Sequence, residues 1–391
     1  MKIMFLAPSY WPALDGVSVV TQYLAEGLAK KHEVRVLATR GEFAQKEEHR
    51  NVAIQRIRAV RNIYLCTFQG EKQAARNCIM DYQPDVLIFV GIQSWFYDWF
   101  VRELNRLPGK KMLMTHGASC LGEYRVWPKL KRIRLRRQIL ADLIEVNFER
   151  YWKNYQRALP KGIGRFNLVS YLYEGDKLYQ WMCEAGLKNS MILENATQEA
   201  FFDRKAYLVD ETKEITFINV SNYEKLKNQD MILRAYGELN LPNTRLLLIG
   251  SRKNPYYEQL VEMKQKFEQD AAFQGKIDIR VGIRREEVLE LYQEADVYVG
   301  ASSTEVMSIS ICEAASAGLL ILSTDVGHAS KVPGVLLFDG LKELKELVLR
   351  ACQEPELRRQ NGRMANAYAE EKYRIQKKVD LLEEKLVGLV K

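Results

Sequence analysis

The sequence predicts an α/β protein built from two doubly wound parallel sheets in tandem. Short apolar runs alternate with helical patterns almost from end to end, and the chain of 391 residues is too long for one ordinary core. A second alternating series starts near residue 215. The composition, 47% hydrophobic and 28% charged, is that of a globular protein. We therefore expect two Rossmann-like domains, each with helices on both faces of its sheet.

The first domain begins with a βαβ unit. Lys2–Ala7 is a buried apolar run, apolar residues at helical spacing follow Gly16, and Val34–Ala38 gives the next strand. Four further strands are expected at Asp85–Val90, Lys111–Thr115, Arg165–Ser170 and Met191–Glu194.

A charged stretch without periodicity, Glu199–Glu214, is expected to link the two domains, which we set at residues 1–200 and 201–371. A last helix, 372–391, is expected to pack back on the first domain. The strands of the second domain are expected at Ile215–Val220, Arg245–Ile249, Ile277–Val281, Val297–Val299 and Leu319–Ser323. Its helices are expected at Asn228–Leu239, Tyr256–Gln269, Arg285–Glu294 and near Ile311–Ala317, with more from Leu341 onward.

The net charge of +8 is concentrated in one segment. Between Arg125 and Arg165 the chain has twelve Lys and Arg against three Asp and Glu, so the remainder is close to neutral. Such a segment favours a local anionic surface as partner and argues against a chain that binds nucleic acid as a whole.

No apolar run approaches the roughly 18 uncharged residues that a membrane-spanning helix needs, and the N-terminus reads as a strand rather than a signal peptide. We expect a cytoplasmic protein. The six cysteines are far apart and form no C-x-x-C pair or cluster with His at metal-ligand spacing, so most are expected to be buried, reduced thiols.

The nucleotide-binding motifs of other classes are missing. No G-x-G-x-x-G follows the first strand and no G-x-x-x-x-G-K-[ST] occurs, which argues against dehydrogenases and P-loop enzymes. There is no D-x-D to hold a divalent metal on a diphosphate, so no metal and no cofactor are expected. Phosphates would then be bound by Lys, Arg and backbone amides.

The strongest motif runs from Glu305 to Gly318 and continues to Gly327. Its E-V-M-S-I-S-I-C-E segment resembles the E-x7-E signature of retaining family-4 glycosyltransferases of the GT-B fold. The resemblance implies two Rossmann-like domains that face a central cleft. A glutamate in the loop can accept hydrogen bonds from sugar hydroxyls, and Glu313, in the first turn of a short helix, can accept both ribose hydroxyls. The amides of Ser308, Ile309 and Ser310 at that helix N-terminus suit a diphosphate.

Other segments extend the resemblance over most of the chain. Gly16 lies in the counterpart of the family's first loop, although Asp15 stands where relatives have a glycine. His116, at the end of a predicted strand, matches the histidine that lies over the donor sugar in relatives. Lys227 matches the lysine of the β-phosphate loop, whereas Asn222 stands where relatives have arginine. Gly282, Ile283 and Arg284 fall where relatives hold the nucleobase.

The basic segment contains a predicted amphipathic helix over residues 127–144, with Leu and Ile among the cations. Such a helix can lie on an anionic membrane, although a solvated helix packed on its own domain is the alternative. The proposed membrane or acceptor surface consists of Lys129, Lys131, Arg132, Arg134, Arg136 and Arg137.

The resemblance implies a retaining, metal-independent hexosyltransferase that moves a sugar from a nucleotide diphosphate donor, UDP-sugar favoured, to a glycan or lipid-linked acceptor. His116, Glu305 and Lys227 are the expected catalytic residues, and retention by same-face attack is expected because no positioned carboxylate nucleophile is evident. Cell-surface polysaccharide assembly at the inner face of the cytoplasmic membrane is the expected setting. Three alternatives remain: a non-catalytic partner protein derived from a transferase, a nucleotide-sugar 2-epimerase, and a nucleic-acid-binding protein that uses the basic segment. The last is disfavoured because aromatic residues are sparse among those cations.

Overall fold

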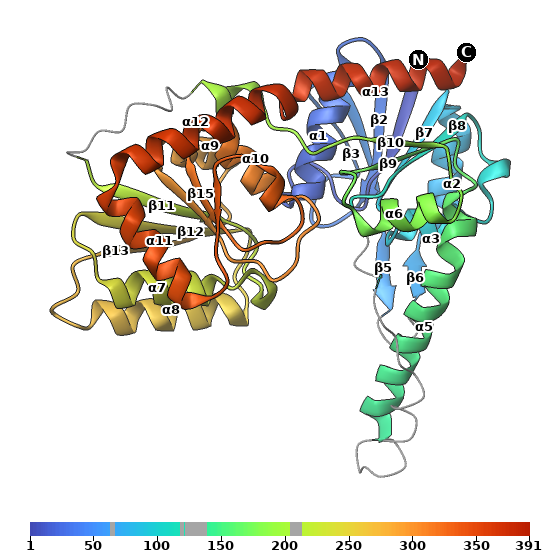
Figure 1. Cartoon of the computed structure of the whole chain (residues 1–391). Coiled ribbons are helices and arrows are strands. Elements are labelled where there is room, and N and C mark those ends of the chain that lie inside the picture. Colours follow the sequence, from blue (N-terminus) through green and yellow to red (C-terminus); the bar gives the residue numbers. More distant parts are fainter. Residues whose placement is uncertain (63–66, 118–120, 122–138, 204–212) are drawn as a thin grey trace. The chain divides into compact units, whose positions relative to one another are not determined.

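The structure is a computed structural model of the chain, and it describes residues 1–62, 67–117, 121, 139–203 and 213–391. The chain divides into two compact units (Figure 1). The first consists of residues 1–13, 17–193 and 379–391, and the second of residues 14–16 and 194–378. The division at 193/194 precedes the stretch Glu199–Glu214, which the sequence suggested as the link, so Glu199 belongs to the second unit.

The first unit contains an eight-stranded sheet in the order β10-β9-β8-β7-β1-β2-β4-β3. All neighbours are parallel except β3 and β4, which pair antiparallel at one edge. The strands are β1 (Lys2–Leu6), β2 (Glu33–Thr39), β3 (Lys46–His49), β4 (Val52–Ile57), β7 (Val86–Val90), β8 (Lys110–Met114), β9 (Leu168–Tyr171) and β10 (Ser190–Ile192). A separate antiparallel pair joins β5 (Ala59–Asn62) and β6 (Thr67–Gly70).

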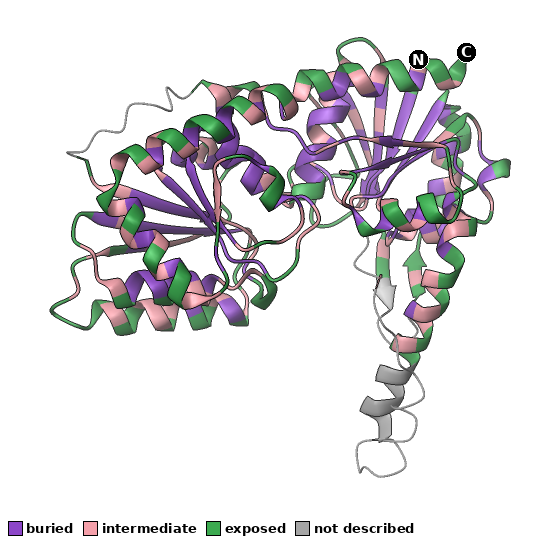
Figure 2. Cartoon of the chain, in the orientation of Figure 1, coloured by how far each residue is buried: buried purple, intermediate pink, exposed green. Residues whose placement is uncertain are grey.

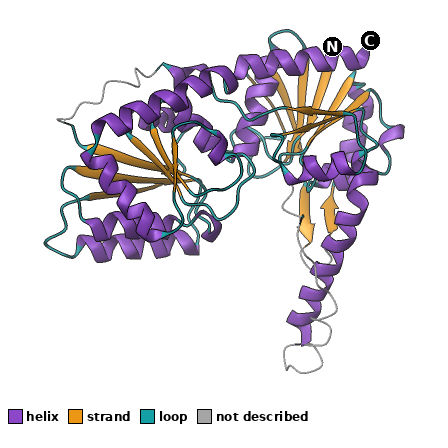
Figure 3. Cartoon of the chain, in the orientation of Figure 1, coloured by secondary structure: helices purple, strands orange, loops and turns teal. Residues whose placement is uncertain are grey.

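The helices of the first unit cover both faces of this sheet (Figure 3). They are α1 (Gly16–Ala29), α2 (Lys72–Tyr82), α3 (Trp95–Phe100), the 3₁₀ turn η1 (Leu104–Arg106), α5 (Ile139–Ile163), α6 (Lys177–Glu184) and the end of α13 (Ile375–Val390). Val379 of α13 packs closely on α1, since a Cβ at Gly27 would lie 2.4 Å from Val379 Cγ2. Glu383 then accepts hydrogen bonds from Lys31 and His32 at 2.7 and 3.0 Å.

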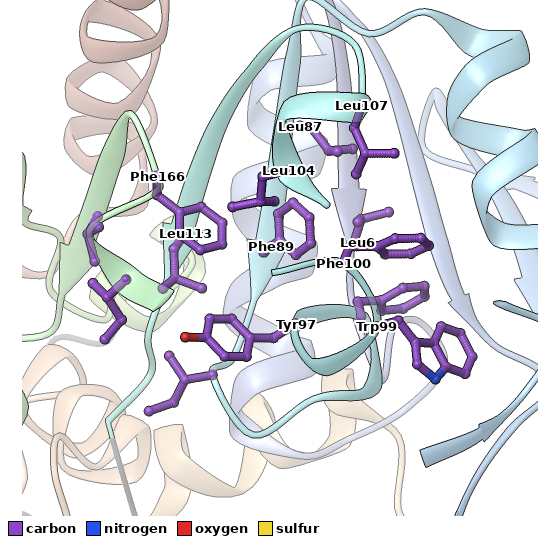
Figure 4. Close-up of a cluster of buried hydrophobic side chains, with 14 of the residues drawn as sticks. Leu6, Leu87, Phe89, Tyr97, Trp99, Phe100, Leu104, Leu107, Leu113 and Phe166 are labelled. Atoms are coloured by element: carbon purple, nitrogen blue, oxygen red, sulfur yellow. The ribbon is translucent and has the colours of Figure 1, made fainter. Parts of the chain in front are cut away.

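The central strands of the first sheet are apolar on both sides because helices cover both faces. Every residue of β7, Val-Leu-Ile-Phe-Val, is buried, as parallel strands require (Figure 2). Figure 4 shows the resulting core, where Phe89 of β7 meets Phe166 edge to face at 5.3 Å and Tyr97 of α3 stacks on the same ring. Aromatic pairs of this kind add stability beyond their buried area.

The second unit contains a six-stranded parallel sheet in the order β13-β12-β11-β14-β15-β16. The strands are β11 (Ile215–Val220), β12 (Thr244–Gly250), β13 (Lys276–Val281), β14 (Val297–Gly300), β15 (Leu320–Ser323) and β16 (Val335–Leu337). The helices are α7 (Gln229–Leu239), α8 (Pro255–Glu268), α9 (Arg285–Glu294), α10 (Ile309–Ser316), α11 (Leu341–Gln353) and α12 (Pro355–Lys372). The 3₁₀ turns are η2 (Glu199–Phe202), η3 (Lys225–Lys227) and η4 (Ala329–Lys331).

Capping residues define where α8 begins and where α7 ends. At the start of α8, the side chain of Asn254 accepts a hydrogen bond from the amide of Tyr257 at 2.9 Å, and Pro255 occupies the first helical position. Asn240 ends α7 in a left-handed conformation with φ 46°. Helix α7 packs against α8 and α11, whereas α10 packs against α12. The predicted doubly wound architecture is confirmed for both sheets.

The cysteines differ from the expectation of mostly buried thiols. Among the four that lie in the described residues, Cys312 is buried, Cys78 and Cys352 are half-buried, and Cys183 is exposed. Burial raises the pKa of the Cys312 thiol well above its ordinary value, so this thiol stays protonated. None of the four is in a disulfide.

Candidate active site

The strand order of the second sheet defines a switch point between β11 and β14. From this pair the chain winds outward in both directions, and sheets of this kind bind ligands at the carboxyl ends of the strands at the switch point. The loops after β11 and β14 are tied together. Asn228 Nδ2 donates to the carbonyl of Ala301 at 2.9 Å, and the amide of Ser303 donates to the carbonyl of Leu226 at 2.8 Å.

Lys227 and Glu305, two of the predicted catalytic residues, meet at this switch point. Lys227 Nζ donates to Glu305 Oε1 at 2.5 Å, and Ser302 Oγ donates to the same oxygen at 2.9 Å. The Lys227 and Glu305 side chains are 23% and 18% exposed, so the pair is accessible at its edge. Lys227 ends η3, and Asn228 after it adopts a left-handed conformation with φ 49°.

Gly327 supports the Glu305 loop, a role that the sequence analysis did not identify. It has φ 59°, and a Cβ there would lie 2.3 Å from the carbonyl oxygen of Val306. Only glycine allows this approach of two backbone segments. The loop after β15 therefore braces the loop after β14.

Glu313 lies on α10 and is 0% exposed. It is the fifth residue of the helix, so it belongs to the second turn, and the prediction that it lies in the first turn is wrong. Its Oε1 accepts a hydrogen bond from Nη2 of Arg285, the first residue of α9. Its Oε2 is buried and has no hydrogen-bond partner in the part of the chain that the structure describes.

Arg285 is a further site residue that the sequence analysis missed. Its guanidinium lies 5.2 Å from the ring centroid of Phe201, which is fully buried in η2. Phe201 in turn meets Tyr292 of α9 edge to face at 5.6 Å. Burial, and secondarily the charge of Glu313, raise the pKa of the Tyr292 hydroxyl well above its ordinary value.

Asn222 lies in the loop after β11, where both its side chain and its backbone accept hydrogen bonds. Its Oδ1 accepts from Ser251 Oγ at 2.7 Å, and its carbonyl accepts from Gln229 Nε2 at 2.9 Å. Ser251 follows β12, so Asn222 joins the ends of two neighbouring strands. The position expected to supply a cation in relatives therefore supplies a neutral amide within a polar network.

Ser308, Ile309 and Ser310 form the start of α10, as the sequence predicted in outline. Ser308 is the N-cap residue without a side-chain cap, and Ser310 Oγ donates to the carbonyl of Val220, the last residue of β11, at 2.6 Å. The first amides of a helix have no partner within it. The hydrogen bond to Val220 holds the N-terminus of α10 at the carboxyl end of β11, beside the switch point.

Gly282, Ile283 and Arg284 follow β13, at the same edge of the sheet but two strands from β11. Gly282 has φ 63° and its amide donates to the carbonyl of Gly250 at 3.0 Å. Arg284 is exposed and pairs with Glu287 at 2.8 Å, which raises the pKa of the guanidinium. The structure therefore does not bring these three residues into contact with the Lys227–Glu305 pair.

His116 lies at the carboxyl edge of the first sheet, whereas Gly16 belongs to the second unit. His116 follows β8 with φ 50°, a left-handed conformation that non-glycine residues rarely adopt, and Gly117 follows with φ 85°. Thr115, buried before it, donates through Oγ1 to the carbonyl of Ser170 at 3.0 Å. Gly16 begins α1, which follows β1, and β1 is two strands from β8 in the order β8-β7-β1.

The six cations of the predicted membrane or acceptor surface, Lys129, Lys131, Arg132, Arg134, Arg136 and Arg137, lie outside the described residues. In the part of the chain that the structure describes, no three His, Cys, Asp or Glu side chains gather in a way that could hold a metal ion. None of the described helices is long and apolar enough to cross a membrane.

Residues 201–366, most of the second unit, match the family model described as glycosyl transferases group 1. A curated relative from Arabidopsis thaliana, one of the subunits of phosphatidylinositol N-acetylglucosaminyltransferase, is 28% identical over 143 residues. That match spans 36% of this chain and only 30% of the relative's length.

Solved structures match the whole chain. Sucrose-phosphate synthase from Thermosynechococcus elongatus aligns over 99% of this chain and 100% of its own with a TM-score of 0.73 at 14% identity. HepE of Anabaena, solved in complex with UDP-glucose, aligns over 100% of both chains with a TM-score of 0.71 at 13% identity. At such identities the likeness concerns the fold alone. The chain therefore has the GT-B fold of glycosyltransferases, and its residues 201–366 resemble the group 1 enzymes, which supports a glycosyltransferase.

Proposed function

We propose that the protein is a retaining, metal-independent hexosyltransferase that uses a nucleotide diphosphate sugar, with a UDP-sugar as the favoured donor. The observation that carries the proposal is the contact of Lys227 with Glu305 at the switch point of the second sheet. A cation for a diphosphate and a carboxylate for sugar hydroxyls are needed side by side, because the sugar is bonded to the diphosphate. One 2.5 Å contact supplies both.

The donor would bind along the carboxyl edge of the second sheet. Lys227 and the first amides of α10 would meet the diphosphate, and Glu305 would accept hydrogen bonds from the sugar. The buried Oε2 of Glu313 would accept from the ribose, since a hydroxyl donor is what this oxygen lacks. Gly282, Ile283 and Arg284 would face the nucleobase farther along the edge.

UDP is favoured because HepE of Anabaena, one of the structural neighbours, was solved in complexes with UDP and with UDP-glucose. The likeness to HepE shows only the fold, so uracil as the base of the donor is part of our proposal and is tested by the donor screen below. Asn222 brings no charge to the diphosphate. Lys227 would therefore have to exchange part of its contact with Glu305 for the phosphate.

The acceptor, a glycan or a lipid-linked sugar, would bind to the first unit, which contains His116. Gly16 would instead serve the donor, because a small residue there lets backbone amides approach the phosphates. The left-handed backbone at His116 favours a functional role, because a strained conformation is retained only where the surroundings enforce it. Same-face attack with retention of configuration is proposed by resemblance. We also propose peripheral attachment to an anionic membrane inner surface through the basic segment, in a role in cell-surface polysaccharide assembly.

The alternative of a non-catalytic partner protein has one observation in its favour. The charge of Lys227 is already balanced by Glu305, and Asn222 adds none, so the described residues at the switch point offer a diphosphate little net positive charge. A partner protein of this kind would bind no donor, or bind it without turnover.

A thermal-shift screen against UDP-, GDP-, ADP- and dTDP-sugars tests the proposal directly. A ligand that binds only the folded chain stabilises it by mass action, by about 2.7 kcal/mol at a ligand concentration of one hundred times Kd. This stabilisation raises the melting temperature. One donor class should stabilise the protein, and its sugar should then be transferred with the anomeric configuration retained in the NMR spectrum of the product. Absence of stabilisation by any donor would refute the transferase; binding without turnover would favour the non-catalytic partner.

A further inference from the structure

Glu313 is a buried carboxylate whose two oxygens have different environments. Oε1 is bound by Arg285, whereas Oε2 is buried and has no hydrogen-bond partner among the described residues. A buried carboxylate with one unsatisfied oxygen costs free energy in the folded protein. We therefore expect a bound ligand to supply the missing hydrogen-bond donor. The Glu313 side chain is 1% exposed, and the two partners of the contact are held on separate helices, Glu313 on α10 and Arg285 on α9.

Arg285 is itself held on more than one side. Its guanidinium lies over the ring of Phe201, and its side chain is only 20% exposed. A planar guanidinium fixed over an aromatic ring has few orientations left, so it dictates the orientation of the carboxylate that it binds. The Arg285 contact therefore determines which oxygen of Glu313 stays available.

We propose that Arg285 is a positioning residue that presents Glu313 Oε2 to the ribose hydroxyls, and that this arrangement makes the site select ribonucleotide over deoxyribonucleotide donors. The inference rests on the proposed function. With Oε1 committed to Arg285, the hydroxyls must share the two lone pairs of Oε2 rather than take one oxygen each. The preference for a ribonucleotide over a deoxyribonucleotide then depends on the position of Glu313 Oε2.

The test compares the Kd of UDP with that of 2′,3′-dideoxy-UDP by calorimetry on the full chain, with the GDP and ADP pairs as further probes. Hydrogen bonds to a charged acceptor are worth ~1.5–3 kcal/mol, so the parent should prefer the ribonucleotide by about 10- to 150-fold. Arg285→Met should reduce that preference to less than about 3-fold. Arg285→Lys, which keeps the charge without the planar fork, should retain an intermediate preference.

Glu313→Gln and the double variant Arg285→Met/Glu313→Gln complete a cycle. Both should lose the preference, and the double variant should lose no more than Arg285→Met, because the two residues act through one oxygen. The double variant also removes the uncompensated buried charge that could unfold Arg285→Met. The matched control is Arg374→Met, since Arg374 lies 4.3 Å over Phe202 and pairs with Glu370 at 2.6 Å, without a contact to Glu313 in the described structure.

The outcomes separate the inference from the function on which it rests. If the parent binds no nucleotide in the panel, both fall together. If the parent binds and discriminates while folded Arg285→Met discriminates equally well, Arg285 is structural and only this inference is wrong. A preference that increases on removing Arg285 would also overturn it, because the arginine would then compete with the ribose. Arg374→Met should keep the parent's preference throughout.

Discussion

Replacing Glu305 by glutamine should separate sugar transfer from nucleotide binding. Glutamine keeps the size and shape of the side chain but removes the charge that strengthens hydrogen bonds from sugar hydroxyls. Losing charge-assisted bonds worth ~1.5–3 kcal/mol in the transition state should lower kcat by about 10- to 150-fold.

The same substitution should tighten the binding of free UDP. In the parent, Lys227 Nζ forms an ion pair with Glu305 Oε1 at 2.5 Å. The pair is partly exposed, with side chains 23% and 18% accessible. Such a pair is worth at most about 1 kcal/mol, so releasing Lys227 to a phosphate should lower the Kd of UDP by roughly 5-fold. The neutral amide of the introduced glutamine can still accept from Ser302, which keeps the loop in place.

Calorimetry with UDP and steady-state kinetics with the UDP-sugar measure the two effects on one preparation. Glu356→Gln is the matched control, because Glu356 pairs with Arg359 at 2.6 Å on α12 and has no assigned role. It should bind UDP and turn over like the parent. If Glu305→Gln instead loses UDP affinity as much as turnover, the carboxylate acts on the nucleotide and our assignment of Glu305 to the sugar is wrong.

Four further changes test the other parts of the reasoning. Transfer should persist in excess EDTA, and activity that is lost and then restored by magnesium or manganese would contradict the metal-free site. Serine in place of the arginines at 132, 134, 136 and 137 should weaken co-sedimentation with anionic vesicles at low salt, and unchanged binding would exclude this docking surface. Burial lowers the pKa of His328 from 6.5 to about 4, so the unfolded chain takes up this proton at a higher pH than the folded chain. About 3 kcal/mol of stability should therefore be lost as the pH falls from about 6.5 to 4. His328→Asn should flatten that part of the pH profile in urea unfolding. Gly327→Ala should destabilise the fold by about 2 kcal/mol or more because of the 2.3 Å approach to Val306 O, whereas Gly388→Ala, with open space around its Cβ, should stabilise by roughly 0.5–1 kcal/mol in thermal unfolding.

Much of the fold could be predicted because buried parallel strands are nearly continuous apolar runs. β11 was predicted at its observed bounds, Ile215–Val220, and so was α9, Arg285–Glu294. β3, Lys-Glu-Glu-His, was missed because an edge strand with no buried side needs no apolar residue. The pair β5 and β6 was missed for a related reason, since its short strands form a separate two-stranded sheet without a core of their own.

The site could be predicted in part. Lys227 and Glu305 follow strands that lie side by side, so the strand pattern and the rule for parallel sheets bring them together. Arg285 could not be found in this way, because it begins a helix in the polar run Arg-Arg-Glu-Glu and meets Glu313 only through packing of α9 and α10. One signal was present: Glu313 sits in the otherwise small and apolar stretch Ile-Cys-Glu-Ala-Ala, where a buried carboxylate requires a cation from elsewhere.

The division of the chain has a consequence for its synthesis. The second unit is almost entirely the continuous stretch 194–378, whereas the first unit needs residues 379–391, which the ribosome adds after that stretch. Until then α1 lacks Val379 against Gly27 and Glu383 beside His32. The second unit can thus fold as soon as it emerges, while the first, although begun earlier, is completed only afterwards. A chain that stops after residue 378 would keep its second unit intact and leave an uncovered α1 surface for proteases and chaperones to recognise.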